Sequence, residues 1–308
     1  MRGTSLTFDL ILLNLWIGMC RGVAGLPRNL RLLGYKDTWI EKKFPNQDLE
    51  PVCPDLVVAS EKVKNTLLLE WKSGANTESD QLRRYSRVTQ SDLETRAFIA
   101  RDASHSHDVV IIGRSEYGDR LRIGIEHGHF PFPLLLVAMD GIGLSYNAFK
   151  VPQLNALFSP KLELDLRRVP SRFVPLDASS DLWEVAEVVM PKVLQYMTER
   201  RSRVDIAVVC QDICDTWSIM GQPARQAVTE KLVEAIRQAS RMHFKKYIRL
   251  AANRGSFEII NNPLDLTSSK RTAVYKKLLS AQKSLLQAMR TGQGDGSEQL
   301  ELFREPTN

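Results

Sequence analysis

Short apolar runs separated by polar turns characterise the first half of the chain. Residues 56–59 form one such run, residues 66–72 form the next, and the six mostly polar residues between them predict a β-hairpin. Similar runs predict further strands at residues 38–44, 108–113, 121–126 and 134–139. A helix is expected to begin after Thr77, with Asp80 in the capping-box position. Strands and helices mixed in this way indicate an α/β fold, with a central mixed sheet flanked by helices.

The second half of the chain has apolar residues at helical spacing. This spacing predicts helices at residues 183–198, 205–217 and 222–240. Pro191 is expected to kink or divide the first of them. A second hairpin is predicted around the turn-rich Asn253-Arg254-Gly255, between residues 247–250 and 257–260. A mostly helical C-terminal domain that ends in a small hairpin resembles a winged-helix module, which docks on DNA.

The N-terminal residues are apolar but do not make a clear membrane or export segment. Asp9 and Asn14 interrupt the run from residue 6 to residue 20, which is too short to span a bilayer. We therefore predict a first helix and no membrane association. A true start at Met19 and an export signal are alternatives that the residues leave open. The four cysteines contain no pair of metal-finger motifs, so buried, reduced thiols in a cytoplasmic protein are expected.

The positive charge of the chain is concentrated near its C-terminus. The formal net charge is +6, yet the segment from Arg241 to Arg290 contains eleven Lys or Arg residues and two acids. Such a cluster releases counterions from a phosphate backbone, so nucleic acid, above all double-stranded DNA, is the first partner to consider. A solvated basic helix without a partner is the alternative. A protein partner or a homodimer is also open.

Two acids and one amine on the first hairpin carry the candidate chemistry. Glu70 and Lys72 are two residues apart on one predicted strand, so their side chains project from the same face. Antiparallel pairing puts Asp55 opposite a residue between 70 and 72, and Asp55 shares that face only if its partner is Glu70 or Lys72. Two carboxylates on one face can bind a hard divalent cation, which polarises a phosphate and acidifies its bound water.

These residues resemble the motif that names the PD-(D/E)XK nuclease superfamily. Pro54-Asp55, fourteen intervening residues and Glu70-Trp71-Lys72 match its pattern, and Gln81 with Tyr85 resembles the Q-x-x-x-Y motif of the RecB-like branch. The resemblance implies a restriction-endonuclease-like fold. It also implies that Asp55, Glu70 and the Trp71 carbonyl hold Mg²⁺, for which Mn²⁺ can substitute.

The same resemblance implies a role for each remaining residue of the motif and an activity for the whole. Lys72 would serve the water nucleophile, while Gln81 and Tyr85 would brace the site and approach the nucleic acid. The family often adds an acid from an upstream helix, for which Asp37 and Glu41 are the candidates. The expected activity is Mg²⁺-dependent hydrolysis of DNA phosphodiester bonds, in restriction, anti-phage defence or repair, and both endonucleolytic and exonucleolytic action stay open.

We accordingly divide the chain into five parts: an N-terminal extension (1–24), a nuclease-like domain (25–150), a proline-marked linker (151–178), a helical, winged-helix-like DNA-binding domain (179–290) and a flexible tail (291–308). Two function classes compete with the nuclease. One is a non-catalytic DNA-binding regulator that keeps the fold, and the other is an adaptor subunit. The histidine pairs at 105/107 and 127/129 could chelate a metal, but loop histidines are the simpler interpretation.

Overall fold

The chain folds into two compact units, which we call the sheet unit and the helical unit. The sheet unit comprises Leu6–Val174 and Ser218–Arg225, and the helical unit is built mainly from Pro175–Trp217 and Gln226–Asn308. The computed structural model describes residues 7–46, 49–96, 104–170, 173–260, 262 and 268–291. Residues 292–308, nearly all of the predicted flexible tail, lie outside this description.

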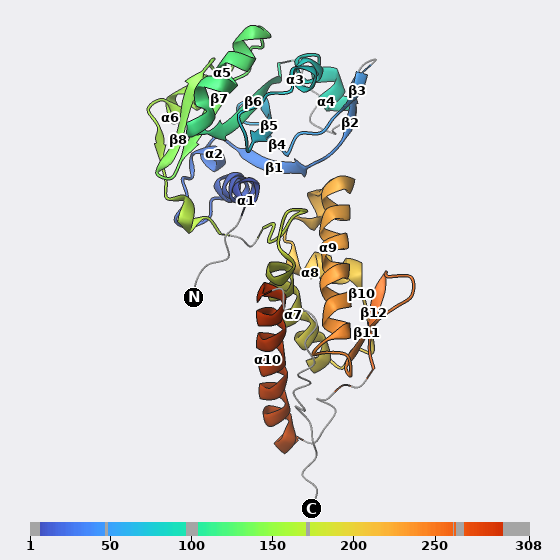
Figure 1. The fold of residues 1–308 in the computed structure, drawn as a ribbon. Helices are drawn as coiled ribbons and strands as arrows, with labels where there is room; N and C mark the ends of the chain where they lie inside the picture. The colour runs from blue at the N-terminus through green and yellow to red at the C-terminus, as the bar shows by residue number, and fades with distance from the viewer. Residues whose placement is uncertain are drawn as a thin grey trace, which may run out of the picture. The chain divides into compact units, whose positions relative to one another are not determined.

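The sheet unit is built on one seven-stranded mixed sheet (Figure 1). The middle strands β5, β6 and β7 run parallel to one another, while the other neighbouring pairs are antiparallel. In spatial order the strands are β1 (Tyr35–Ile40), β4 (Leu56–Ser60), β5 (Asn65–Lys72), β6 (Ser106–Arg114), β7 (Leu134–Ala138), β8 (Gly141–Tyr146) and β9 (Leu162–Glu163). The expected α/β fold with a central mixed sheet is confirmed.

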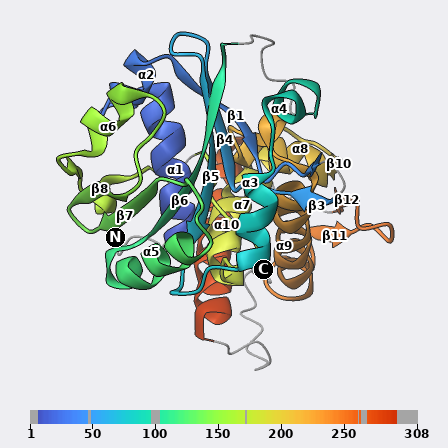
Figure 2. The ribbon, with the colours of Figure 1, turned by 90° about the horizontal axis from the view of Figure 1, so that it is seen from above.

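Helices cover both faces of this sheet (Figure 2). On one face lie α1 (Phe8–Arg21) and α6 (Pro152–Phe158), whose Trp16 and Phe158 rings are 5.9 Å apart. The opposite face is covered by α3 (Ser79–Ser86), α4 (Gln90–Arg96) and α5 (Gly118–His127). The short helix α2 (Asn29–Leu32) and the small hairpin β2 (Phe44–Asn46) and β3 (Leu49–Val52) complete the unit.

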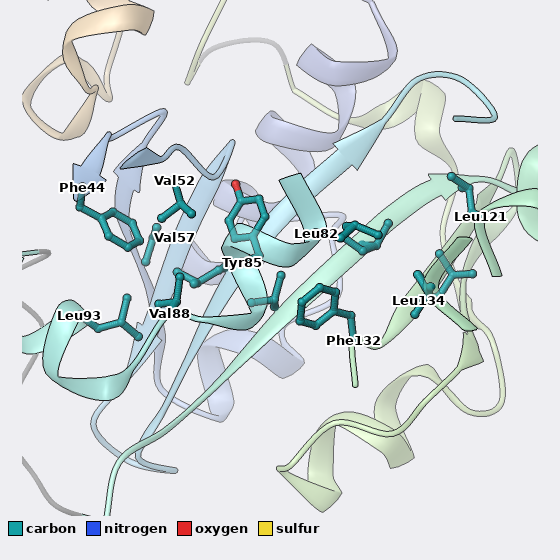
Figure 3. Close-up of a cluster of buried hydrophobic side chains, with 14 residues drawn as sticks. Phe44, Val52, Val57, Leu82, Tyr85, Val88, Leu93, Leu121, Phe132 and Leu134 are labelled. Atoms are coloured by element: carbon teal, nitrogen blue, oxygen red, sulfur yellow. The ribbon is translucent and has the colours of Figure 1, made fainter. Parts of the chain in front are cut away.

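A buried apolar cluster fixes α3 on the sheet. Figure 3 shows Leu82 and Tyr85 of α3 among side chains of the strands and of α4 and α5. Val57 of β4 and Leu68 of β5 lie in the same cluster and have no exposed surface. Burial of each large apolar side chain stabilises the fold by about 1.5–3 kcal/mol. The position of α3 over β4 and β5 is therefore set by the core.

One predicted strand is a helix. Residues 121–126 alternate between apolar and other residues, which suggested a strand, yet they lie in α5. Leu121 and Ile125, one helical turn apart, are fully buried, whereas Ile123 between them is 43% exposed. A strand would place Ile123 on the same face as Leu121 and Ile125. Because only the i, i+4 pair faces the sheet, helical spacing gives the correct pattern.

The boundaries of the other predicted elements shift by a few residues. The predicted strand at 38–44 is β1, which begins earlier, at Tyr35, and ends at Ile40. Helix α3 begins at Ser79, and its first residues receive no side-chain cap, so the capping box predicted for Thr77 and Asp80 is wrong. The hairpin of β4 and β5 agrees with the prediction to within one residue at each end.

Most of the two segments that the sequence analysis set apart as extension and linker belongs to the sheet unit, which takes in residues 6–174, whereas residues 175–178 belong to the helical unit. Asn14 of α1 is fully buried. Its side chain donates to the Val174 carbonyl at 2.8 Å and accepts from the Phe173 amide at 3.1 Å. These contacts tie the first helix to the last residues of the unit. Strand β9 and helix α6 also lie within residues 151–174 and pack in this unit.

The helical unit contains four helices among the described residues, with a small three-stranded sheet. The helices are α7 (Leu182–Thr198), α8 (Ile206–Ile213), α9 (Gln222–Arg241), which belongs to this unit from Gln226 on, and α10 (Ser268–Thr291). The strands β10 (Arg203–Asp205), β12 (Ser256–Ile259) and β11 (Ile248–Leu250) are antiparallel and lie in that spatial order. Pro191 does not divide α7, and α8 ends before the predicted boundary at residue 217.

The cysteines agree with one further expectation. All four cysteines are free thiols, and Cys20, Cys210 and Cys214 are buried. Across the described part of the chain, no helix combines the length and apolar character needed to cross a lipid bilayer.

Candidate active site

The register of the β4–β5 hairpin brings the two candidate carboxylates together. Leu56 pairs with Leu69 and Val57 with Leu68, so the residue before β4, Asp55, falls opposite Glu70. Residues that pair across two strands project from the same face. The register is thus one of the two that the hypothesis needed, and the alternative in which Asp55 faces Trp71 is excluded. Asp55, Glu70 and Lys72 share the face that α3 covers.

Glu70 is the centre of a buried hydrogen-bond network. Only 5% of the residue is exposed, and both carboxylate oxygens accept hydrogen bonds. Oε1 accepts from Lys72 Nζ at 3.0 Å and from Gln81 Nε2 at 2.7 Å. Oε2 accepts from the Tyr85 hydroxyl at 2.7 Å. Lys72 also donates to Gln81 Oε1, so its ammonium lies between the two side chains.

Helix α3 delivers Gln81 and Tyr85 to this network. The two residues are four apart and therefore lie on one face of the helix. Tyr85 is 1% exposed, and with the fully buried Leu82 it anchors α3 on the sheet. Burial of its ring beside the Glu70 carboxylate raises the pKa of the Tyr85 hydroxyl, which stays protonated and donates. Helix α3 thus holds the Glu70 carboxylate in place through hydrogen bonds from Gln81 and Tyr85.

Asp55 lies in a negative environment. Its Oδ2 accepts a hydrogen bond from the Trp71 backbone amide at 2.7 Å. Burial and the nearby Glu70 carboxylate raise the pKa of Asp55, although the Trp71 hydrogen bond opposes the shift. The N–H and C=O groups of one strand residue point toward the same neighbouring strand, so the Trp71 carbonyl also faces the Asp55 side. The Asp55 and Glu70 carboxylates are therefore close enough to repel each other, and the Trp71 backbone lies beside Asp55.

Asp9, an acid that the sequence analysis missed, adds to the negative charge around Asp55. Glu41 and Asp9 both raise the pKa of Asp55 through their negative charges, although less than burial and Glu70 do. Asp37, the other upstream candidate, instead forms an ion pair with Arg21 at 2.6 Å. Asp9 lies in the first turn of α1, forty-six positions before Asp55, and its proximity depends on the fold. The position of an acid at the start of a buried upstream helix was the sequence signal that could have identified Asp9 as a site residue.

The other candidate ligands do not form a metal centre. Across the described residues, no group of three or more His, Cys, Asp or Glu side chains is arranged to hold a metal ion. His105 is buried against the Thr66 hydroxyl at 2.9 Å, and burial lowers the pKa of His107 to about 4. Burial together with the charges of Glu41 and Asp55 raises the pKa of the Cys53 thiol to about 12.

The donor set at Asp55 and Glu70 suits a hard divalent cation. Mg²⁺ prefers oxygen ligands and is often held by one or two carboxylates, with the rest of its shell supplied by water and substrate. The raised pKa of Asp55 reflects burial first and repulsion from nearby acids second, and a nearby cation would relieve that repulsion. The residues present therefore fit Mg²⁺, and Lys72 lies beside the Glu70 carboxylate.

One family matches this chain, over residues 9–174, and it is described as the MJECL32 domain. The match covers more than half of the sequence. This chain belongs to the MJECL32 domain family. No curated protein and no solved structure gives a significant match. The MJECL32 domain coincides closely with Leu6–Val174 of the sheet unit, and it contains the seven-stranded sheet and every residue of the candidate active site.

Proposed function

We propose that this chain is a Mg²⁺-dependent nuclease of the PD-(D/E)XK type that hydrolyses DNA phosphodiester bonds. The observation that supports this most strongly is the buried Glu70 carboxylate, held by Lys72, Gln81 and Tyr85 beside Asp55. Asp55 directly precedes β4, Glu70 and Lys72 lie in β5, and the RecB-like pair comes from a helix that packs on this hairpin. A resemblance in spacing alone does not require these five side chains to meet.

The proposed mechanism assigns a task to each residue. Asp55, Glu70 and the Trp71 carbonyl would hold Mg²⁺, which supplies Lewis-acid activation of the phosphate and of the attacking water. Lys72 orients that water through its ammonium and offsets negative charge that develops on the phosphate. Gln81 and Tyr85 keep the Glu70 carboxylate in one orientation through their hydrogen bonds. Together they hold the reacting groups in fixed positions.

The helical unit has features that support a winged-helix assignment. Its elements follow the chain order α7, β10, α8, α9, β11, β12, and β12 lies between the other two strands. This is the arrangement of a winged helix, in which a hairpin follows the second helix of a helix-turn-helix pair. We propose that the helical unit is the DNA-docking module and that the sheet unit performs the cleavage.

A non-catalytic role is the second candidate, and one observation favours it. Both oxygens of Glu70 accept hydrogen bonds from protein groups, as they would in a purely structural polar cluster. In that case the chain would bind DNA as a regulator or adaptor without cutting it. Cleavage assays separate the two candidates directly.

The test is plasmid nicking by the full chain with MgCl₂ and with EDTA. We expect nicking only with MgCl₂, and a loss of about 10²-fold or more in Glu70→Gln, which keeps the side-chain shape but removes the charge. The matched control is Glu61→Gln, because Glu61 is exposed in the loop of the same hairpin. Nicking that is unaffected by EDTA, or equal rates for Glu70→Gln and the control, would exclude the proposed site.

A further inference from the structure

A basic groove lies in the helical unit between the end of α9 and the β11–β12 hairpin. Its volume is about 490 Å³, and Ile248 and Ile260 contribute apolar surface to it. Five cationic side chains line it: Arg237, Arg241, Lys245, Arg249 and Arg254. These residues lie within residues 237–254, on the end of α9, the turn after it and the β11–β12 hairpin, so the path of the chain through these elements brings them to one groove.

Two of these cations are already neutralised by neighbouring acids. Arg237 forms an ion pair with Glu234, and Arg249 pairs with Glu258 at 2.6 Å. Arg241, Lys245 and Arg254 are exposed, and among the described residues no acid pairs with them. The groove therefore has an excess positive charge carried by these three side chains. An anionic ligand is the chemistry that such a lining recognises.

The exposed cation of α9, Arg241, lies at the C-terminal end of the helix. The exposed face of the same helix carries Gln226 and Glu230 closer to its start, and the Gln226 amide donates to Glu230 at 2.9 Å. Glu234 follows one turn later. Acids repel a phosphate backbone, so the middle of this face is a poor site for one. The positive surface is instead formed by the helix end, Lys245 and the hairpin turn that contains Arg254.

We propose that this groove binds the phosphate backbone of double-stranded DNA. The B-form major groove admits a helix or a two-stranded ribbon, so either element can enter it while the cations contact the flanking phosphates, whereas the deep, narrow major groove of A-form RNA admits neither element. Contacts through Arg241, Lys245 and Arg254 carry no base information, so the binding is independent of sequence. The choice of nucleic acid as the partner rests on the proposed nuclease function.

The experiment measures fluorescence anisotropy of a labelled duplex with the full chain, in EDTA so that no cutting occurs. We expect the variant Arg241→Ala/Lys245→Ala/Arg254→Ala to bind at least about tenfold more weakly than the parent near physiological salt. The slope of log affinity against log salt is expected to fall by about 0.9 for each phosphate contact removed. Circular dichroism melting of each variant verifies that the helical unit is folded.

The matched control replaces the same number of cations on α10 in the variant Lys276→Ala/Lys277→Ala/Lys283→Ala. These three lysines are exposed, and none lines the groove. The control is expected to bind close to the parent. Equal losses in the two triple variants would show a diffuse basic surface and overturn the groove assignment. Unchanged affinity in the groove variant, or equal binding of duplex RNA and duplex DNA, would overturn it as well.

The nicking assay on Glu70→Gln keeps this proposal separate from the nuclease proposal. If Glu70→Gln cuts DNA at the normal rate while the groove variant loses DNA affinity, the active-site assignment is wrong and the groove assignment is correct. If Glu70→Gln does not cut DNA while the groove variant binds DNA with normal affinity, the groove assignment is wrong and the active-site assignment is correct.

Discussion

Replacing Lys72 with methionine distinguishes a catalytic cluster from a structural ion pair. Methionine keeps the length and apolar stem of lysine but removes the ammonium that donates to Glu70 and Gln81. In a metal-binding site the ammonium and the cation compete for the same Glu70 oxygen. The variant is therefore expected to be less stable than the parent without Mg²⁺ but to gain more stability when Mg²⁺ is added.

The expected loss of stability in Lys72→Met follows from the burial of the Lys72–Glu70 ion pair. The side chains of Lys72 and Glu70 are 13% and 7% exposed, and removing one partner of a buried pair costs about 3–5 kcal/mol. Glu70 keeps the donors Gln81 and Tyr85, so we expect a smaller loss, about 2 kcal/mol. For a unit of this size the midpoint of thermal unfolding would fall by about 4–8 °C. A ligand at a hundred times its Kd restores about 2.7 kcal/mol.

Calorimetric unfolding with EDTA and with saturating MgCl₂ measures both effects, and plasmid nicking reports activity. Lys36→Met is the matched control, because Lys36 is exposed on the edge strand β1. We expect Lys72→Met to be inactive and to show a larger Mg²⁺-induced shift than the parent or the control. A variant that loses stability but does not respond to Mg²⁺ would identify the cluster as a structural ion pair. A variant that nicks DNA at the parent rate would remove Lys72 from the mechanism.

Two further predictions concern stability alone. Because the folded chain keeps the Asp55 proton to a higher pH than the unfolded chain does, the parent loses stability as the pH rises above about 4 and through the raised pKa. Asp55→Asn removes this loss, so calorimetry in EDTA should find it more stable than the parent by about 0.5–2 kcal/mol near pH 8, with the difference vanishing toward pH 4. Equal stability at both pH values would contradict the charge repulsion that we assign to Asp55. Ile125→Asp should destabilise the sheet unit by about 4 kcal/mol or more, whereas Ile123→Asp should change denaturant unfolding by only about 0.5 kcal/mol, because Ile125 is buried and Ile123 is 43% exposed. Equal losses in both would support the strand that the alternation suggested.

Local sequence patterns were sufficient to predict the hairpin that carries the site. The runs in β4 and β5 are apolar on both faces because both strands lie inside the sheet, and strands of this kind read as continuous apolar runs. The register was not readable from the sequence, because a shift of one residue gives an equally apolar pairing. The structure resolves this by placing Asp55 opposite Glu70.

Contacts between residues far apart in the chain could not be predicted from local sequence patterns. Asn14 suggested an interrupted apolar run, yet it is a buried residue that links α1 to Val174. The same fold brings Asp9 near enough to influence the pKa of Asp55. These relations join residues far apart in the chain, so local periodicity contains no signal for them. The boundaries of the sheet unit were missed for the same reason.

The central claim is that Asp55 and Glu70 together bind a divalent cation. A crystal structure of the full chain grown with MnCl₂, with anomalous diffraction data, tests it most directly. We predict an anomalous peak that contacts both carboxylates and the Trp71 carbonyl at about 2.0–2.3 Å. The absence of such a peak at saturating MnCl₂, with Glu70 still bonded to Lys72, Gln81 and Tyr85, would contradict it.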